Sequence, residues 1–229
     1  MNAHPNKPHI AINMAMSADG KISTWRRESF QMGSGEDKQL MNVLRARSDA
    51  VVIGSGTLRV DGFPLIVRDE ALVKKRLKLK KPAQPINAIM SNSLSFPLTK
   101  KLFHHADTEK IVFTLRSALR DRIGRIERYA EVVALPGTTV SPKLVVNHLA
   151  LKRCERILVE GGGAINFSFL KADLVDELYV TLSPTIIGGA TAPTVADGHG
   201  FLRNTRLRLE LLSSKKIENE LFLHYRVLR

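Results

Sequence analysis

Short runs of apolar residues, each bounded by turn residues, recur along the chain and predict strands. Polar residues do not alternate with the apolar ones within these runs, which is typical of strands of a parallel sheet that are covered on both faces. The predicted strands are Ile10–Met16, Ala50–Ile53, Ile86–Met90, Ile111–Thr114, Val132–Leu135, Ile157–Val159 and Leu178–Leu182.

Stretches with helical spacing lie between these runs. Ser34-Gly35-Glu36-Asp37 has the spacing of a capping box, and Leu40, Val43 and Leu44 then share one face of the helix that it would begin. Ser141-Pro142 predicts a second helix start, with proline at the first helical position. His148 lies on the apolar stripe of that helix. A core or surface histidine is a simpler interpretation of this position than a ligand-binding one.

The C-terminal part has a different pattern. The runs Leu207–Leu212 and Leu221–Val227 flank a polar turn at residues 217–220, which predicts an antiparallel hairpin. Alternating strands and helices followed by a hairpin predict an α/β fold with a mixed, mainly parallel sheet flanked by helices. We expect a single domain over residues 1–229 with an ordered core from about residue 9.

Composition narrows the class of protein. The 229 residues are 44% hydrophobic and 25% charged, as in ordinary globular chains. No run approaches the roughly 20 apolar residues of a spanning helix, and residues 1–5 lack the apolar stretch of a signal peptide. We therefore expect a cytoplasmic protein without a membrane segment. The one cysteine, Cys154, predicts a small buried residue and no cysteine-based metal site.

The formal net charge of +13 raises the possibility of an acidic partner such as nucleic acid. Six of the eight residues from Lys74 to Lys81 are basic, but no aromatic residue interrupts them. A solvated loop or helix face is the favoured interpretation of this run. Binding of a phosphate-rich small molecule or of RNA is the alternative.

Three glycine-bearing segments follow or end predicted strands. Asn13–Ile22 ends in the turn signal Asp19-Gly20, and Ser48–Asp61 contains Gly54-Ser55-Gly56-Thr57. In the third segment, Glu160 closes a strand before Gly161-Gly162-Gly163 and a predicted helix at Ile165–Ala172. Consecutive glycines before a helix start allow a pyrophosphate to approach the backbone, although a tight turn alone is the alternative.

In this order and spacing, the three segments resemble the reductase domain of riboflavin biosynthesis, which has the dihydrofolate-reductase-like fold. The resemblance covers nearly the whole chain from about His9. Its strongest anchors are Ser17–Ile22, Leu44–Ala50, Gly54–Thr57, Glu160–Gly162 and Leu174–Leu178.

The resemblance implies an NADPH-dependent reduction of a phosphoribosylaminopyrimidine at C1′ of its sugar, which gives the ribitylamino product. The resemblance and the glycine segments together predict cofactor contacts at Ala15, Gln31, Gly54, Gly56, Thr57, Asp61, Ser91, Gly161, Gly162, Gly163, Ala164, Ile165 and Asn166, and the resemblance continues the last segment to Ser168. Those that it assigns to the substrate are Asn13, Ser29, Arg45, Leu65, Arg68 and Glu160. Arg45 and Arg68 could bind a sugar phosphate through forked hydrogen bonds.

We interpret Asp61 and Glu160 as the catalytic pair. On this hypothesis Glu160 orients the sugar hydroxyls, and Asp61 positions the cofactor and helps to relay the proton that accompanies the hydride. A role of Glu160 in pinning its own glycine turn is the alternative. Ser91, Lys100, Lys101 and Arg116 follow predicted strands, and they motivate a preference for NADPH over NADH of at least about tenfold.

The sequence departs from the family pattern at Ala18, at Gln31 and in the loop Asp61–Leu65, where proline is moved by one residue. In bacteria the resembling reductase domain is the C-terminal half of a bifunctional deaminase/reductase. The sequence lacks the zinc signature of the deaminase half, so we expect a separate protein to supply the deamination step. We expect no metal and a homodimer formed through the C-terminal hairpin. The alternatives are a reductase of another small substrate and a basic nucleotide-binding or nucleic-acid-binding protein without turnover.

Overall fold

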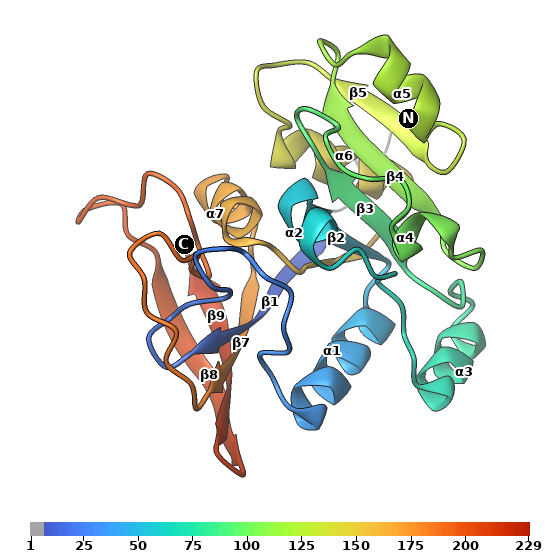
Figure 1. Cartoon of the computed structure of the whole chain (residues 1–229). Coiled ribbons are helices and arrows are strands. Elements are labelled where there is room, and N and C mark those ends of the chain that lie inside the picture. The colour runs from blue at the N-terminus through green and yellow to red at the C-terminus, as the bar shows by residue number, and fades with distance from the viewer. Residues whose placement is uncertain (1–6) are drawn as a thin grey trace. The chain divides into compact units, whose positions relative to one another are not determined.

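The computed structural model describes residues 7–229, so the predicted absence of a signal peptide concerns residues outside this range. The chain falls into two compact units (Figure 1). Unit 1 comprises residues 7–9 and Asn42–Leu158, and unit 2 comprises Ile10–Met41 and Val159–Arg229. The division falls within helix α1 (Gly35–Arg47).

The described residues form a mixed, mostly parallel sheet of nine strands in the order β5-β4-β3-β2-β6-β1-β7-β9-β8, in which β8 is Arg208–Ile217 and β9 is Glu220–Leu228. This arrangement confirms the predicted fold class. All seven predicted strands are present and differ from the prediction by at most one residue at either end. They are β1 (His9–Ser17), β2 (Ala50–Gly54), β3 (Ile86–Met90), β4 (Lys110–Leu115), β5 (Glu131–Leu135), β6 (Arg156–Val159) and β7 (Glu177–Ser183).

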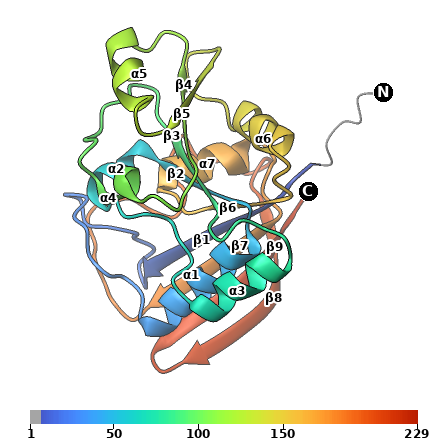
Figure 2. The same cartoon turned by 90° about the vertical axis from the view of Figure 1, so that its right-hand side faces the viewer.

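Unit 1 is built on the parallel strands β2, β3, β4 and β5. All five residues of β2 and the last five of β4 are buried, as expected for strands that helices cover on both faces. Figure 2 shows α5 and α6 on opposite sides of these strands. The helices wholly within this unit are α2 (Ser55–Val60), α3 (Glu70–Lys78), α4 (Lys101–His104), α5 (Arg120–Ile126) and α6 (Pro142–Leu151).

Both predicted helix starts are confirmed. The Ser34 hydroxyl accepts a hydrogen bond from the Glu36 amide (3.1 Å), as the capping-box pattern indicates. Pro142 occupies the first turn of α6, after Ser141. In that helix Leu149 is fully buried and His148 is half-buried with its ring edge on Phe113. The proline therefore sets the helix start without a side-chain cap.

Unit 2 contains β1, β7, helix α7 (Gly163–Lys171) and the C-terminal strands β9 (Glu220–Leu228) and β8 (Arg208–Ile217). β1 and β7 are parallel, whereas β9 is antiparallel to both β7 and β8. The hairpin is confirmed but is longer than predicted, because its first strand continues through Lys216. Only Glu218 and Asn219 form the turn, and Glu218 has a φ of 51°.

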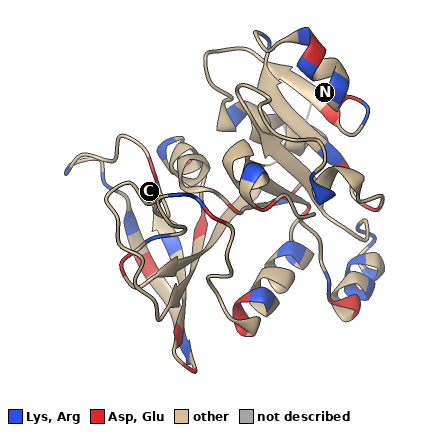
Figure 3. Cartoon of the chain, viewed as in Figure 1, with Lys and Arg blue, Asp and Glu red and all other residues tan. Residues whose placement is uncertain are grey.

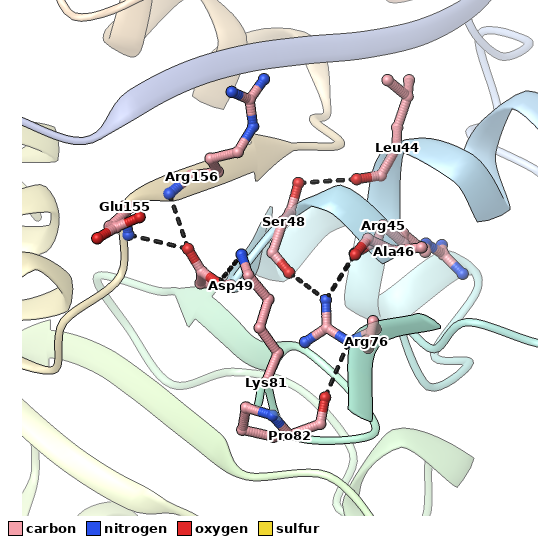
Figure 4. Close-up of polar contacts among 10 residues, drawn as sticks. All are labelled: Leu44, Arg45, Ala46, Ser48, Asp49, Arg76, Lys81, Pro82, Glu155 and Arg156. Carbon is pink, nitrogen blue, oxygen red and sulfur yellow. Dashed lines mark hydrogen bonds and ion pairs between the residues drawn. The ribbon is translucent and has the colours of Figure 1, made fainter. Parts of the chain in front are cut away.

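Arg76 corrects the interpretation of the basic run as a solvated face. Most of the run lies exposed on α3 and just after it, but Arg76 is only 1% exposed. Its guanidinium donates to the carbonyls of Arg45, Ala46, Ser48 and Pro82 at 2.5 to 3.3 Å (Figure 4). Burial lowers the pKa of Arg76, and the nearby Asp49 charge acts in the opposite direction. Arg76 therefore joins α3 to the end of α1.

Asp49 holds the start of β6 beside the start of β2. Its Oδ2 accepts hydrogen bonds from the amides of Glu155 and Arg156, both at 2.9 Å, and its Oδ1 pairs with Lys81 Nζ at 2.6 Å (Figure 4). Lys81, the last residue of the basic run, is thus also committed to the fold.

The remaining basic residues are spread over several elements, including α3, α5 and the C-terminal hairpin (Figure 3). Within residues 7–229, no helix combines the length and the apolar character needed to cross a membrane. Cys154 is buried as predicted, and burial raises the pKa of its thiol to about 12.

Candidate active site

The predicted site residues form two groups, one in each unit. Unit 2 holds Asn13, Ala15, Ser29, Gln31, Glu160 and the segment Gly161–Asn166. Unit 1 holds Arg45, Gly54, Gly56, Thr57, Asp61, Leu65, Arg68 and Ser91.

Asn13 and Ala15 lie two residues apart on β1, so their side chains share one face of the strand. Asn13 is 8% exposed, and its Oδ1 has no hydrogen-bond partner among the described residues. A buried amide oxygen without a partner is costly unless a ligand or water satisfies it. This face of β1 is therefore suited to a polar ligand.

The segment after β6 has the backbone that a glycine cluster permits. Gly161 has a φ of +82°, and a Cβ there would lie 2.9 Å from Met14 Sδ. At Gly163 a Cβ would collide with the Thr194 carbonyl oxygen and approach Asp197 Oδ2 to 2.7 Å. Backbone conformation therefore requires glycine at position 161, and close packing requires it at position 163. Both requirements fit the alternative that this segment is a tight turn.

Packing alone does not explain the start of α7. The helix begins at Gly163, two residues before the prediction, and the amides of Ile165 and Asn166 donate to the Gly162 carbonyl. Asn166 is fully buried, and its Nδ2 donates to the Val195 carbonyl at 2.8 Å. Its Oδ1 has no partner among residues 7–229. The start of α7 thus has two features that suit a ligand: an amide oxygen that needs a hydrogen-bond donor, and the positive end of a helix dipole, which favours phosphate.

The loop after β1 carries Ser29 and Gln31, and both side chains are exposed. The Gln31 amide donates to the Gly33 carbonyl (2.8 Å) and accepts from Lys38 Nζ (2.5 Å). Gln31 therefore orders the approach to α1. Its assignment to the cofactor stays a prediction.

From the sequence, Asp37 is expected only to contribute to the capping box at the start of α1. Burial raises the pKa of its carboxyl, the charges of Glu220 and Glu160 raise it further, and the Thr181 hydroxyl beside it acts in the opposite direction. Glu220 is itself 7% exposed and accepts from the Ser34 amide (2.9 Å) and hydroxyl (2.6 Å). The signal that could have revealed Asp37 is a second acid in the first turn after Ser34.

In unit 1 the Gly54–Thr57 segment joins β2 to α2 as predicted. Gly56 has an ordinary φ, and the nearest described atom to a Cβ there would be Arg59 Nη2 at 3.9 Å. Neither backbone conformation nor crowding therefore requires glycine at this position. The open space fits the close approach of a ligand to the backbone.

Asp61 ends α2, where its amide donates to the Thr57 carbonyl, and its side chain is exposed. The next residue, Gly62, has a φ of +63°. Its missing side chain leaves room for the stem of Lys100, whose Nζ donates to the Val60 carbonyl. In this loop, where proline is moved by one residue from the family pattern, the chain therefore also makes a turn at Gly62.

The loop at residues 65–68 is held by side chains from neighbouring elements. The amide and carbonyl of Leu65 bond to Asn87, and the Arg68 amide donates to Asn42 Oδ1 (2.8 Å). Arg45, 6% exposed, donates from Nη1 to the Ile66 carbonyl (3.1 Å). The structure therefore brings Arg45, Leu65 and Arg68 together, with the Arg68 side chain exposed.

Ser91 is buried after β3, where its hydroxyl accepts a hydrogen bond from the Leu94 amide (3.0 Å). Of the residues predicted to favour NADPH, Lys100 bonds to Val60 and Lys101 Nζ lies 5.7 Å from the ring centre of Phe63. Arg116, at the end of β4, is exposed. Arg116 is therefore better placed than the two lysines to bind a 2′-phosphate, and the preference for NADPH stays a prediction.

The chain is similar to known proteins over most of its length. The chain is 32% identical over 201 residues to the 2,5-diamino-6-ribosylamino-4(3H)-pyrimidinone 5′-phosphate reductase of Archaeoglobus fulgidus, covering 88% of this chain and 91% of that one. It is 29% identical over 222 residues to the protein of the same name from Methanothermobacter thermautotrophicus, covering 96% and 99%.

Two solved structures extend the comparison. A pyrimidine reductase-like protein from Corynebacterium diphtheriae superposes with a TM-score of 0.87 at 26% identity, covering 98% of this chain and 93% of that one. Dihydrofolate reductase from Enterococcus faecalis gives a TM-score of 0.50 at 13% identity, covering 97% and 98%, and shows the likeness of fold alone. The sequence model of the RibD C-terminal domain matches residues 8–223. The chain therefore belongs to the RibD C-terminal domain family.

Proposed function

We propose that this protein is an NADPH-dependent reductase that converts a ribosylaminopyrimidine 5′-phosphate to its ribitylamino product in riboflavin biosynthesis. The names of its relatives support this proposal, because the similarity covers most of both chains. The observation that carries it is the glycine segment at the start of α7, where the buried Asn166 keeps an unsatisfied amide oxygen.

The residues present fit a nicotinamide dinucleotide. Gly56 leaves open space above the backbone, and the start of α7 offers backbone N–H groups and the positive end of a helix dipole. The residues that would hold the cofactor are Ala15, Gln31, Gly54, Gly56, Thr57, Asp61, Ser91 and Gly161–Asn166. When bound, NADPH supplies the hydride for C1′.

The substrate is bound through its phosphate and its polar ring groups. The exposed Arg68 guanidinium binds the phosphate, and the buried Arg45 positions the loop that carries it through its bond to Ile66. The buried Asn13 Oδ1 accepts a hydrogen bond from a donor on the pyrimidine or the sugar. Ser29 and Leu65 complete the predicted contacts.

Glu160 and Asp61 are the proposed catalytic residues. Glu160 accepts hydrogen bonds from the sugar hydroxyls and so orients C1′, and Asp61 helps to relay the proton that must accompany hydride addition. Asp37 acts through Glu160: its charge interacts with that of Glu160, and its protonation changes the electrostatic environment of the acid.

The relatives named above act, by their names, on a 2,5-diamino-pyrimidinone, the form that has not been deaminated. We therefore propose this compound as the substrate, with a separate protein performing deamination. The test follows NADPH absorbance at 340 nm with the deaminated and non-deaminated pyrimidine phosphates in parallel. Faster oxidation with the 2,5-diamino compound is expected. Oxidation with neither compound would overturn the proposal.

The proposed assembly is a homodimer formed through the C-terminal hairpin. Of the residues predicted to face a partner, Leu221 is exposed, Leu223 is half-buried and Val227 is buried. Leu209 and Leu211 of β8 are 43% and 52% exposed, and they pair with Val227 and Tyr225 on the same face. Because β8 is also the last strand of the sheet, its edge and face both favour coverage by a second copy.

A further inference from the structure

A cavity of about 370 Å³ in unit 1 has none of the predicted site residues in its lining. It is lined by residues from three places, α2, the loop after β3 and α5, which are Arg59, Leu94, Ser95, Phe96, Pro97, Leu98, Arg122, Arg125 and Ile126. Its volume lies within the range of small-molecule sites. Three arginines and no acidic residue contribute to its lining.

Two of these arginines are held in place by the loop that they surround. Arg59 Nη1 donates to the Ser95 carbonyl at 3.0 Å, and Arg122 Nη1 donates to the Ser93 carbonyl at 2.7 Å. A guanidinium has five N–H donors, so each bond leaves donors for another acceptor. The loop itself is fixed by the bond between Ser91 and Leu94 and by the stacking of Phe96 on Phe103. The positive groups are thus partly preorganised.

The local charge is not neutralised by the protein. Residues 116–128 contain five arginines and two acidic residues. Within the described part of the chain, no carboxylate lies within 4.0 Å of the guanidinium nitrogens of Arg59, Arg122 or Arg125. The three arginines are exposed and two of them are held by the loop. Arginines without acidic partners favour an anion that accepts several hydrogen bonds, and phosphate meets this requirement.

We propose that this cavity binds a phosphate monoester, whose phosphate group accepts hydrogen bonds from Arg59, Arg122 and Arg125. The apolar wall of Leu94, Phe96 and Ile126 accommodates the organic part of the molecule. Two sources share this chemistry: the 2′-phosphate of the adenosine ribose of NADPH, and a separate phosphorylated metabolite. Binding in the cavity does not depend on turnover, so this proposal and the proposed function can fail independently.

Calorimetric titration of the full-length protein with inorganic phosphate and with 2′-AMP tests the proposal. Among residues 7–229 the structure records no hydrogen bond or ion pair of the Arg125 side chain, so Arg125→Ala removes one phosphate-binding group without breaking such a contact. The double variant Arg122→Ala/Arg125→Ala removes two of these groups. Arg120→Ala and Arg128→Ala on the same segment are matched controls, because neither residue lines the cavity. We expect the dissociation constant of 2′-AMP to rise about tenfold in Arg125→Ala and further in the double variant. The controls should change it by less than about twofold.

The two sources are distinguished by titration with NADPH and NADH. If the cavity holds the cofactor's 2′-phosphate, the double variant weakens NADPH binding and leaves NADH binding unchanged. If it holds a separate metabolite, the variant weakens binding of phosphate and 2′-AMP and leaves both cofactors unaffected. Failure of the wild-type protein to bind either phosphate probe would overturn the proposal, as would equal losses in the control variants.

Discussion

At the scale of single residues, Glu160 carries the most specific mechanistic assignment. Glu160→Gln keeps the size of the side chain but removes its charge, so we expect turnover to fall about a hundredfold with little change in NADPH affinity. Steady-state kinetics and a cofactor titration measure the two quantities.

Glu36→Gln is the matched control for this change, because Glu36 is exposed in the first turn of α1 and lies outside the proposed site. Its turnover should equal that of the wild type. An unchanged kcat in a folded Glu160→Gln protein would leave Glu160 as a turn residue.

Arg76 tests the structural account of the basic run. In Arg76→Lys, one ammonium group cannot reach both the carbonyls at the end of α1 and just after it and the Pro82 carbonyl, which the guanidinium now bridges. We expect the free energy of unfolding to fall by about 2–4 kcal/mol. Urea denaturation measures this change, with Lys75→Arg at the exposed neighbouring position as the control. Equal stability of Arg76→Lys and wild type would show that the buried bonds are replaceable.

Asp37 gives a pH dependence with a defined sign. Its folded-state pKa lies above the ordinary value of 3.8, so the folded protein binds the proton more tightly than the unfolded chain does. Stability therefore decreases as pH rises from the ordinary value through the raised pKa. Charges from Glu220, Glu160 and Lys38 face this carboxyl and contribute to the same titration.

We expect Asp37→Asn to remove part of this decrease, so that the variant gains stability relative to wild type at neutral pH. Thermal denaturation at a series of pH values from about 4 to about 7 measures the effect. Parallel pH profiles for the two proteins would contradict the assignment.

At the scale of elements, strand positions were predictable because each strand is a short buried run bounded by turn residues. β3 matches its predicted range at both ends. The hairpin was less predictable, because Ser213–Lys216 are polar and continue β8 only through their pairing with β9. Helices α3 and α5 carry so many charged residues that no apolar stripe marks them.

The candidate site was predictable where a motif fixes the local backbone. The Gly161–Gly163 turn and the Gly54–Thr57 connection follow from glycine spacing after a strand. The burial of Arg76 and the environment of Asp37 depend on residues far away in the sequence, such as Ser48 and Glu220. No local pattern could reveal such contacts.

At the scale of the whole molecule, the proposed homodimer makes a direct prediction. Light scattering at micromolar concentration should give about twice the 25.5 kDa of one chain. Leu209→Glu/Leu211→Glu places two charges on the exposed face of β8 and should shift the protein to the monomer. A wild-type mass near 25.5 kDa would contradict the dimer.

The proposed reaction is the reduction of C1′ of a ribosylaminopyrimidine 5′-phosphate by a hydride from NADPH. Its most direct test is turnover of the 2,5-diamino substrate with NADPH carrying deuterium on one or the other face of nicotinamide C4. We expect mass spectrometry and NMR to show a single deuterium at C1′ of the ribityl product with one of the two labelled cofactors. A product without deuterium from either cofactor, or oxidation of NADPH without a ribityl product, would contradict the claim.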